Sequence, residues 1–116
     1  MRGGSTAVGK LVRDRIPDII RASGRTPHVT IMRPDTYRRA LIDKLREEVA
    51  ELAAAPTTES LVEEAADVLG VLTAIAVEHG ADLATIGDIA RAKRNERGGF
   101  DRRLCLDDVD PLHTGR

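Results

Sequence analysis

Two pairs of acidic residues in the middle of the chain constrain its fold most strongly. They are Glu48 with Glu51 and Glu64 with Asp67, and within each pair the two residues are three positions apart. Residues three apart lie on the same face of an α-helix. The surrounding segment, residues 47–90, holds ten acidic residues and no Lys or Arg, although the whole chain has a net charge of −1. We therefore expect two neighbouring helices in an acidic centre, with the basic residues at the two ends of the chain.

Start and stop signals predict four helices. Pro17 fits the first turn of a short helix, and Gly24 fits its left-handed stop. Longer helices are expected over residues 36–54, 58–80 and 82–96, and the sequence AAPTT separates the first two of these. Ser60 and Glu63 have capping-box spacing and offer an alternative start for the helix that begins near residue 58.

The two acidic pairs are placed symmetrically about the turn between their helices. If these helices form an antiparallel hairpin, both pairs lie at the same level and four carboxylates converge. Like charges this close raise one another's pKa and destabilise the fold unless something neutralises them. Oxygen ligands of this kind suit Mg²⁺ or Mn²⁺. The alternative is an ordinary solvated acidic face, but Glu64 and Asp67 interrupt an otherwise apolar helix, where unpaired charge is costly.

Composition points to an all-α fold. A chain of 116 residues forms one domain, and with only one Tyr and one Phe its core must come from Leu, Ile, Val and Ala. We expect a domain over residues 10–107, with a flexible N-terminus at 1–9 and a flexible tail at 108–116. The pattern also allows a small two-stranded β appendage made of residues 28–32 and 100–106, with Phe100 in its core and Cys105 buried.

Charge and cysteine content limit the partners and the compartment. A near-neutral chain lacks the basic surface that binding to a nucleic-acid polymer requires. The single Cys105 forms no intrachain disulfide, which fits a reducing cytosol. The longest apolar stretch, residues 68–77, is too short to cross a bilayer, and no signal peptide is visible. We expect a cytoplasmic protein without membrane contact.

The acidic motifs resemble those of a known superfamily. EEVAE at 47–51 and EAAD at 64–67 are similar to the EExxE…ExxD signature of the all-α nucleoside triphosphate pyrophosphohydrolases, the MazG-like superfamily. KLVRDRIP near the start and KRNERGGF near the end resemble its phosphoribosyl-ATP pyrophosphohydrolase-like branch. The resemblance covers residues 10–106. It implies an oligomeric helical bundle that binds Mg²⁺ and hydrolyses a nucleoside triphosphate to the monophosphate and pyrophosphate.

The resemblance also implies roles for individual residues. Glu48, Glu51, Glu64 and Asp67 match the metal ligands. Glu47 and Glu48 match the catalytic positions, with Glu47 orienting or activating the attacking water. Lys93 and Arg97, with Asn95 as a weaker candidate, match triphosphate contacts. Lys10, Arg13 and Arg15 could reach phosphate or could pair with nearby Asp14 and Asp18 instead.

Several alternatives stay open at this point. The apolar helix over 58–80 indicates a homodimer or homotetramer, since one hairpin cannot cover it on every side. The substrate could be a non-canonical or surplus nucleotide, as in house-cleaning enzymes, or phosphoribosyl-ATP. A non-catalytic helical oligomer that binds metal or nucleotide is the rival from a different class. Base and sugar preference, and one metal or two, are not indicated.

Overall fold

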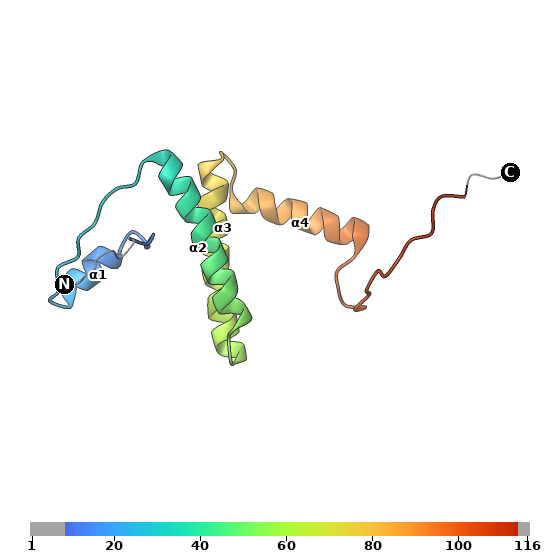
Figure 1. Ribbon diagram of the computed structural model, residues 1–116, viewed down its shortest axis with the longest axis horizontal. Helices are drawn as coiled ribbons and strands as arrows, with labels where there is room; N and C mark the ends of the chain where they lie inside the picture. Colours follow the sequence, from blue (N-terminus) through green and yellow to red (C-terminus); the bar gives the residue numbers. More distant parts are fainter. Residues whose placement is uncertain (1–8, 114–116) are drawn as a thin grey trace. The chain divides into compact units, whose positions relative to one another are not determined.

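A computed structural model describes residues 9–113, and its four helices are α1 (Ile16–Ala22), α2 (Pro34–Ala53), α3 (Thr58–Glu78) and α4 (Leu83–Arg97) (Figure 1). The described residues contain no strand, so the fold is all-α, as predicted. The chain divides into two compact units, one ending at Leu83 and one beginning at Ala84. Most of the expected flexible N-terminus (residues 1–8) and the end of the expected flexible tail (residues 114–116) lie outside the described residues.

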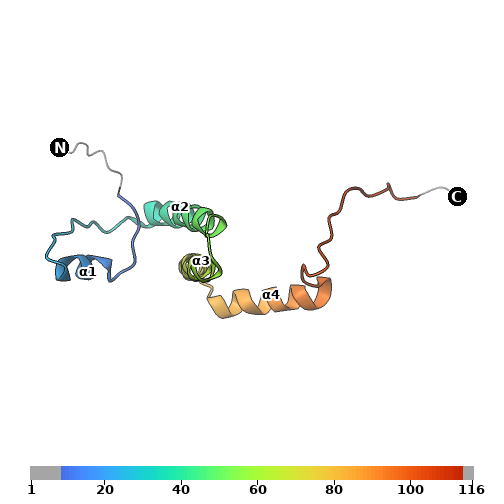
Figure 2. The same cartoon turned by 90° about the horizontal axis from the view of Figure 1, so that it is seen from below.

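Helices α2 and α3 form the hairpin that the acidic pairs predicted. The two helices are joined by residues 54–57 and pack along each other (Figures 1 and 2). Pro34 occupies the first turn of α2 after an extended Arg33. Thr57 caps α3 through a reciprocal pair of hydrogen bonds, in which its side chain accepts from the Ser60 amide and the Ser60 hydroxyl accepts from the Thr57 amide. The capping box thus starts at Thr57, three residues before the Ser60 start considered from the sequence.

The hairpin buries little of its own surface. Leu41 and Ala76 are the buried apolar residues, and Glu48 is the buried charged residue, among those the structure describes. Ion pairing between the two helices adds a contact near their other end, where Arg38 Nε lies 3.1 Å from Glu78 Oε1. Glu48 is thus a charged residue inside a very small core, and the candidate site lies at its position along the hairpin.

Helix α1 follows a stretch of irregular chain and is short. Pro17 lies in its first turn, and Gly24, with a φ of 90°, follows its last turn. A positive φ is unfavourable for residues with a Cβ, which explains a glycine at this position. The signals read from the sequence therefore gave both ends of α1 correctly.

The second unit contains α4 from Ala84 onward and the chain after it. Gly98, with a φ of 88°, ends the helix. The predicted β appendage is absent from the described residues, because 28–32 and 100–106 are both without strand. Residues 100–103 form a turn instead, with the Arg103 amide donating to the Phe100 carbonyl at 3.1 Å and a positive φ at Arg103. Two-stranded pairs are marginal on their own, and a left-handed residue interrupts a strand.

Two expectations tied to that appendage are also wrong. Phe100 is 96% exposed rather than part of a core, and Cys105 is exposed rather than buried. Without strand pairing, neither side chain has a sheet against which to pack. None of the described helices combines the length and apolar character that crossing a membrane requires.

Candidate metal centre

Three glutamates from the two hairpin helices converge on one point. Glu48 and Glu51 come from successive turns of α2, and Glu64 comes from α3. One carboxylate oxygen from each residue lies within 4.8 Å of the other two. The structure therefore brings together three of the four predicted ligands, at the level of the hairpin that the sequence indicated.

Glu48 gives this cluster a feature that a solvated acidic face lacks. Its exposure is only 7%, and its buried Oε1 has no hydrogen-bond partner among the described residues. Its other oxygen lies 3.5 Å from the Lys44 ammonium. A buried carboxylate oxygen without a partner is unfavourable by the full desolvation cost of that group. A hard divalent cation would satisfy it, and an all-oxygen donor set fits Mg²⁺ or Mn²⁺.

The charges of the cluster shift its titration. Burial, followed by the negative charges of Glu51, Asp67 and Glu48, raises the pKa of Glu64. The half-buried Glu64 thus takes up a proton more readily than an isolated glutamate would. A bound cation would remove this repulsion, so the electrostatics favour cation binding over an empty cluster.

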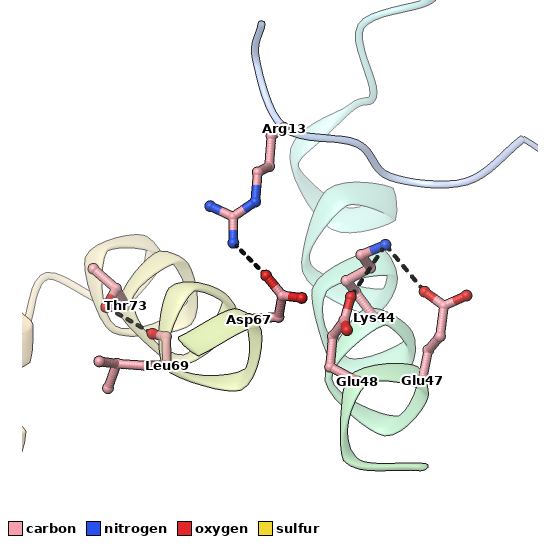
Figure 3. Close-up of polar contacts among 7 residues, drawn as sticks. All are labelled: Arg13, Lys44, Glu47, Glu48, Asp67, Leu69 and Thr73. Atoms are coloured by element: carbon pink, nitrogen blue, oxygen red, sulfur yellow. Dashed lines mark hydrogen bonds and ion pairs between the residues drawn. The ribbon is translucent and has the colours of Figure 1, made fainter. Parts of the chain in front are cut away.

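Lys44 neutralises the side of the cluster that α2 provides (Figure 3). Its ammonium donates to Glu47 Oε1 at 3.0 Å and also lies near Glu48. Burial lowers the pKa of Lys44, but the two carboxylates together outweigh burial and raise it. The hydrogen bond from Lys44 and its charge, with a further effect of Lys10, lower the pKa of Glu47. Glu47 is therefore fully ionised and a weaker proton acceptor than an isolated glutamate.

Asp67, the fourth predicted ligand, is not within the group of three glutamates. Arg13 donates from Nη2 to its Oδ1 at 3.0 Å (Figure 3). Lys10 lies 3.9 Å from Glu47 Oε2. The ion pairs of Lys10 and Arg13 are thus with the acidic helices, and neither is with Asp14 or Asp18. Sequence spacing could not reveal the Arg13 contact, since Arg13 and Asp67 are 54 positions apart.

A depression of ≈ 300 Å³ adjoins these side chains. Its polar wall includes Arg13, Lys44, Glu48 and Asp67, and its apolar wall includes Tyr37, Leu41 and Val71. Leu11 and Val12 complete it from the segment before α1. Lys10 and Arg13 of this segment were predicted from the sequence as possible phosphate contacts, but Leu11 and Val12 between them were not assigned to the site, although an apolar pair flanked by two basic residues was the available signal.

The predicted phosphate contacts lie on α4, in the second unit. Lys93 and Arg97 both line a depression of ≈ 690 Å³ within that unit, together with Arg91, Arg94 and Phe100. Asn95 does not line it. Arg94 and Arg97 are near carboxylates of their own unit, at 3.9 Å from Asp101 and 3.5 Å from Glu96 respectively. The structure therefore groups two of the three predicted residues with further cations and an exposed aromatic ring.

Comparison with known proteins gives one family and one close partial relative. The family model described as phosphoribosyl-ATP pyrophosphohydrolase matches residues 21–94, which include all four acidic motif positions. An uncharacterized protein of Mycolicibacterium smegmatis is 55% identical over 56 residues, or 48% of this chain and 57% of the relative. The chain thus spans a little over half the length of that relative. No solved structure matches.

Proposed function

The chain belongs to the phosphoribosyl-ATP pyrophosphohydrolase family, and on this premise we propose that it is a divalent-metal-dependent nucleotide pyrophosphohydrolase. In the proposed reaction, water attacks the α-phosphorus of a nucleoside triphosphate and the bond to the β-phosphate breaks. The products are a nucleoside monophosphate and pyrophosphate. The observation that carries the proposal is the buried Glu48 oxygen without a partner, inside a cluster of three glutamates.

Glu48, Glu51 and Glu64, with Asp67, would hold the cation, and Mg²⁺ is the proposed ion, with Mn²⁺ as a substitute. When bound, such an ion lowers the pKa of water and offsets negative charge on the phosphoryl oxygens. The rigid part of this arrangement is the buried Glu48, because packing limits its side chain more than those of the exposed Glu51 and the half-buried Glu64.

We assign Glu47 to orienting the attacking water by hydrogen bonding. Its carboxylate is held by Lys44 at 3.0 Å, and its lowered pKa makes it a weak general base. Glu48 faces the buried side of the cluster and is needed there as a ligand. Lys44 is therefore a positioning residue, because it contacts both carboxylates and fixes the side from which water is presented.

Lys93 and Arg97 are proposed to contact the phosphates of the leaving pyrophosphate. Both line the same depression on α4, where the neighbouring Arg91 and Arg94 add positive charge. Charge-assisted hydrogen bonds from such groups stabilise the charge that develops on the leaving group. Asn95 is a secondary candidate.

The substrate is either a non-canonical or surplus nucleoside triphosphate or phosphoribosyl-ATP itself. The description of the matching family favours phosphoribosyl-ATP. The motifs KLVRDRIP and KRNERGGF resemble a branch that is only similar to that enzyme, so they leave other nucleoside triphosphates open as substrates. Removal of unwanted nucleotides in the cytoplasm is the role we propose if the first class is correct.

The test is pyrophosphate release from a panel of canonical and modified nucleoside triphosphates and phosphoribosyl-ATP, with Mg²⁺ and with EDTA. We expect a monophosphate and pyrophosphate from at least one substrate, with release abolished by EDTA and by Glu51→Gln. Arg39→Gln serves as the matched control, since Arg39 is exposed and lies outside the cluster. Metal binding without turnover of any substrate would reject the enzyme and favour a non-catalytic metal-binding protein.

A further inference from the structure

The segment of residues 10–14, before α1, contacts the α2–α3 hairpin although it forms no helix. Leu11 is half-buried, and residues 11–14 line the depression beside the acidic cluster. The two basic residues of the segment reach two different carboxylates of the hairpin, Lys10 at Glu47 and Arg13 at Asp67. The segment is therefore positioned by both apolar contact and charge.

Gly70 provides the space in which the Arg13 side chain lies. A Cβ built at Gly70 would be 3.1 Å from Arg13 Nη2 and 3.5 Å from Nη1. Gly70 is three residues after Asp67, so both lie on the face of α3 that the guanidinium covers. Glycine is unfavourable inside a helix, and close approach of another group is a physical reason for one there. Asp67 and Gly70 thus form a seat for the Arg13 guanidinium.

Because of this seat, Arg13 already occupies a carboxylate that a divalent cation would need. Oxygens of Glu48, Glu51 and Glu64 are mutually within 4.8 Å, whereas the Asp67 carboxylate is bonded to Arg13 and is outside that group. A divalent cation that recruited Asp67 would place two like charges beside the same carboxylate. Because the pair is exposed, at 68% for the Arg13 side chain and 43% for that of Asp67, the guanidinium can leave at small cost.

We propose that Arg13 competes with the divalent cation for Asp67 and, once displaced, binds a phosphate group of the nucleotide. The second half rests on the proposed hydrolysis of a nucleotide, whereas the competition rests only on the proposed cation site. Displacement would leave the guanidinium in the wall of the ≈ 300 Å³ depression, which the apolar residues Tyr37 and Leu41 also line. The planar guanidinium suits two-point contact with phosphate oxygens.

The competition is tested by titrating Mn²⁺ into the metal-free full chain by calorimetry. Arg13→Gln removes the competing charge and should tighten Mn²⁺ binding about 1.5- to 5-fold, the range expected for an exposed ion pair. Gly70→Leu fills the seat and should act in the same direction. Arg39→Gln is the control, since it removes an equal charge on the exposed side of α2 that has no ion pair among the described residues, and its Mn²⁺ affinity should stay unchanged.

The opposite result has a definite meaning. If Arg13 orients Asp67 as a ligand instead of withholding it, Arg13→Gln should weaken Mn²⁺ binding about 10- to 100-fold. Weaker or unchanged binding in Arg13→Gln would overturn the competition. This measurement needs no turnover, so it stands even if the chain hydrolyses no nucleotide.

The phosphate contact is tested by steady-state kinetics with the substrate found in the panel. Arg13→Gln should raise KM by roughly ten-fold, as expected for a lost hydrogen bond between charged groups, and lower kcat less. Arg13→Lys should restore part of the KM, because it returns the charge without the planar fork. An unchanged KM in Arg13→Gln, with Mn²⁺ binding tightened, would reject the phosphate contact and leave the competition intact.

Discussion

Glu64 shows how the acidic cluster destabilises the metal-free chain. Burial and the charges of Glu51, Asp67 and Glu48 raise its pKa, so the folded chain holds this proton more tightly than the unfolded chain. The stability that this proton contributes is present below the ordinary pKa of glutamate and is lost as pH rises through the raised value. At neutral pH the ionised carboxylate is therefore repelled in the folded state.

Replacing this carboxylate should separate stability from metal binding. We predict that Glu64→Gln raises the melting temperature of the metal-free protein at pH 7 and flattens its dependence on pH between the ordinary pKa of glutamate and pH 7. The variant should lose most of the stabilisation that Mg²⁺ gives the parent chain. Thermal melts across this pH range with EDTA, and at pH 7 with Mg²⁺, provide the check. A variant that melts lower than the parent in EDTA would show that Glu64 has a structural role.

Asp67 has one feature that the sequence predicts, its helix face, and one that it does not, its ion pair with Arg13. Its place on the acidic face of a helix could be predicted from the i, i+3 spacing with Glu64. Its ion pair with Arg13 could not, because no local pattern links residues 54 positions apart. Relief of repulsion alone would make Asp67→Asn neutral or stabilising without metal. The Arg13 contact opposes that gain, so Asp67 is a poorer test of repulsion than Glu64.

The start of α3 depends on the capping box of Thr57 and Ser60. We predict that Thr57→Ala lowers the free energy of unfolding by about 1 kcal/mol, since it leaves the Ser60 amide without its acceptor. Thr57→Ser keeps the oxygen and should retain most of the stability. Urea denaturation of both, with Thr58→Ala as the neighbouring control, measures the difference. Equal losses in Thr57→Ala and Thr58→Ala would show that the cap contributes nothing specific.

At the scale of helices, local signals were sufficient wherever the backbone itself decides the structure. Pro17, Gly24, Gly80 and Gly98 mark helix ends, and the last three have positive φ. Residues 28–32 form no strand, because weak alternation of apolar residues does not create a partner strand. Phe100 is exposed for the same reason, since its predicted burial depended entirely on that pairing. Burial by distant segments has no local signature.

A cation held by glutamates of both α2 and α3 would cross-link the hairpin. We predict that Mg²⁺ raises the melting temperature of the chain, because binding at 100 times the dissociation constant adds about 2.7 kcal/mol. Glu51→Gln should melt at nearly the same temperature with and without Mg²⁺. Differential scanning calorimetry over a Mg²⁺ series tests this, with Ca²⁺ as a comparison for ion size. A parent curve that stays unchanged at tens of millimolar Mg²⁺ would reject the site.

The whole molecule has a thin core and a large uncovered apolar surface. Only Leu41 and Ala76 are buried apolar residues among those described, whereas α3 exposes Leu61, Val62, Leu69 and Val77. At 100° per residue, Val62 and Leu69 lie about 20° apart on α3, and Glu64 lies roughly opposite them. The apolar stripe of Val62 and Leu69 therefore points away from the carboxylates that meet α2.

This stripe should be the contact between copies of the chain. Leu69 and Val62 are 47% and 59% exposed, and apolar surface of this kind is buried at interfaces of obligate oligomers. We predict that the parent chain runs as a dimer or tetramer of its 12.6 kDa mass, and that Leu69→Arg shifts it to the mass of one chain. Light scattering after size exclusion measures both, with Thr30→Arg as a control that adds the same charge in an exposed loop.

Because one hairpin buries so little, the separated chain should also unfold at lower urea concentration. A parent chain that is monomeric at micromolar concentration, or a Leu69→Arg variant that keeps the parent mass, would place the interface elsewhere or remove it.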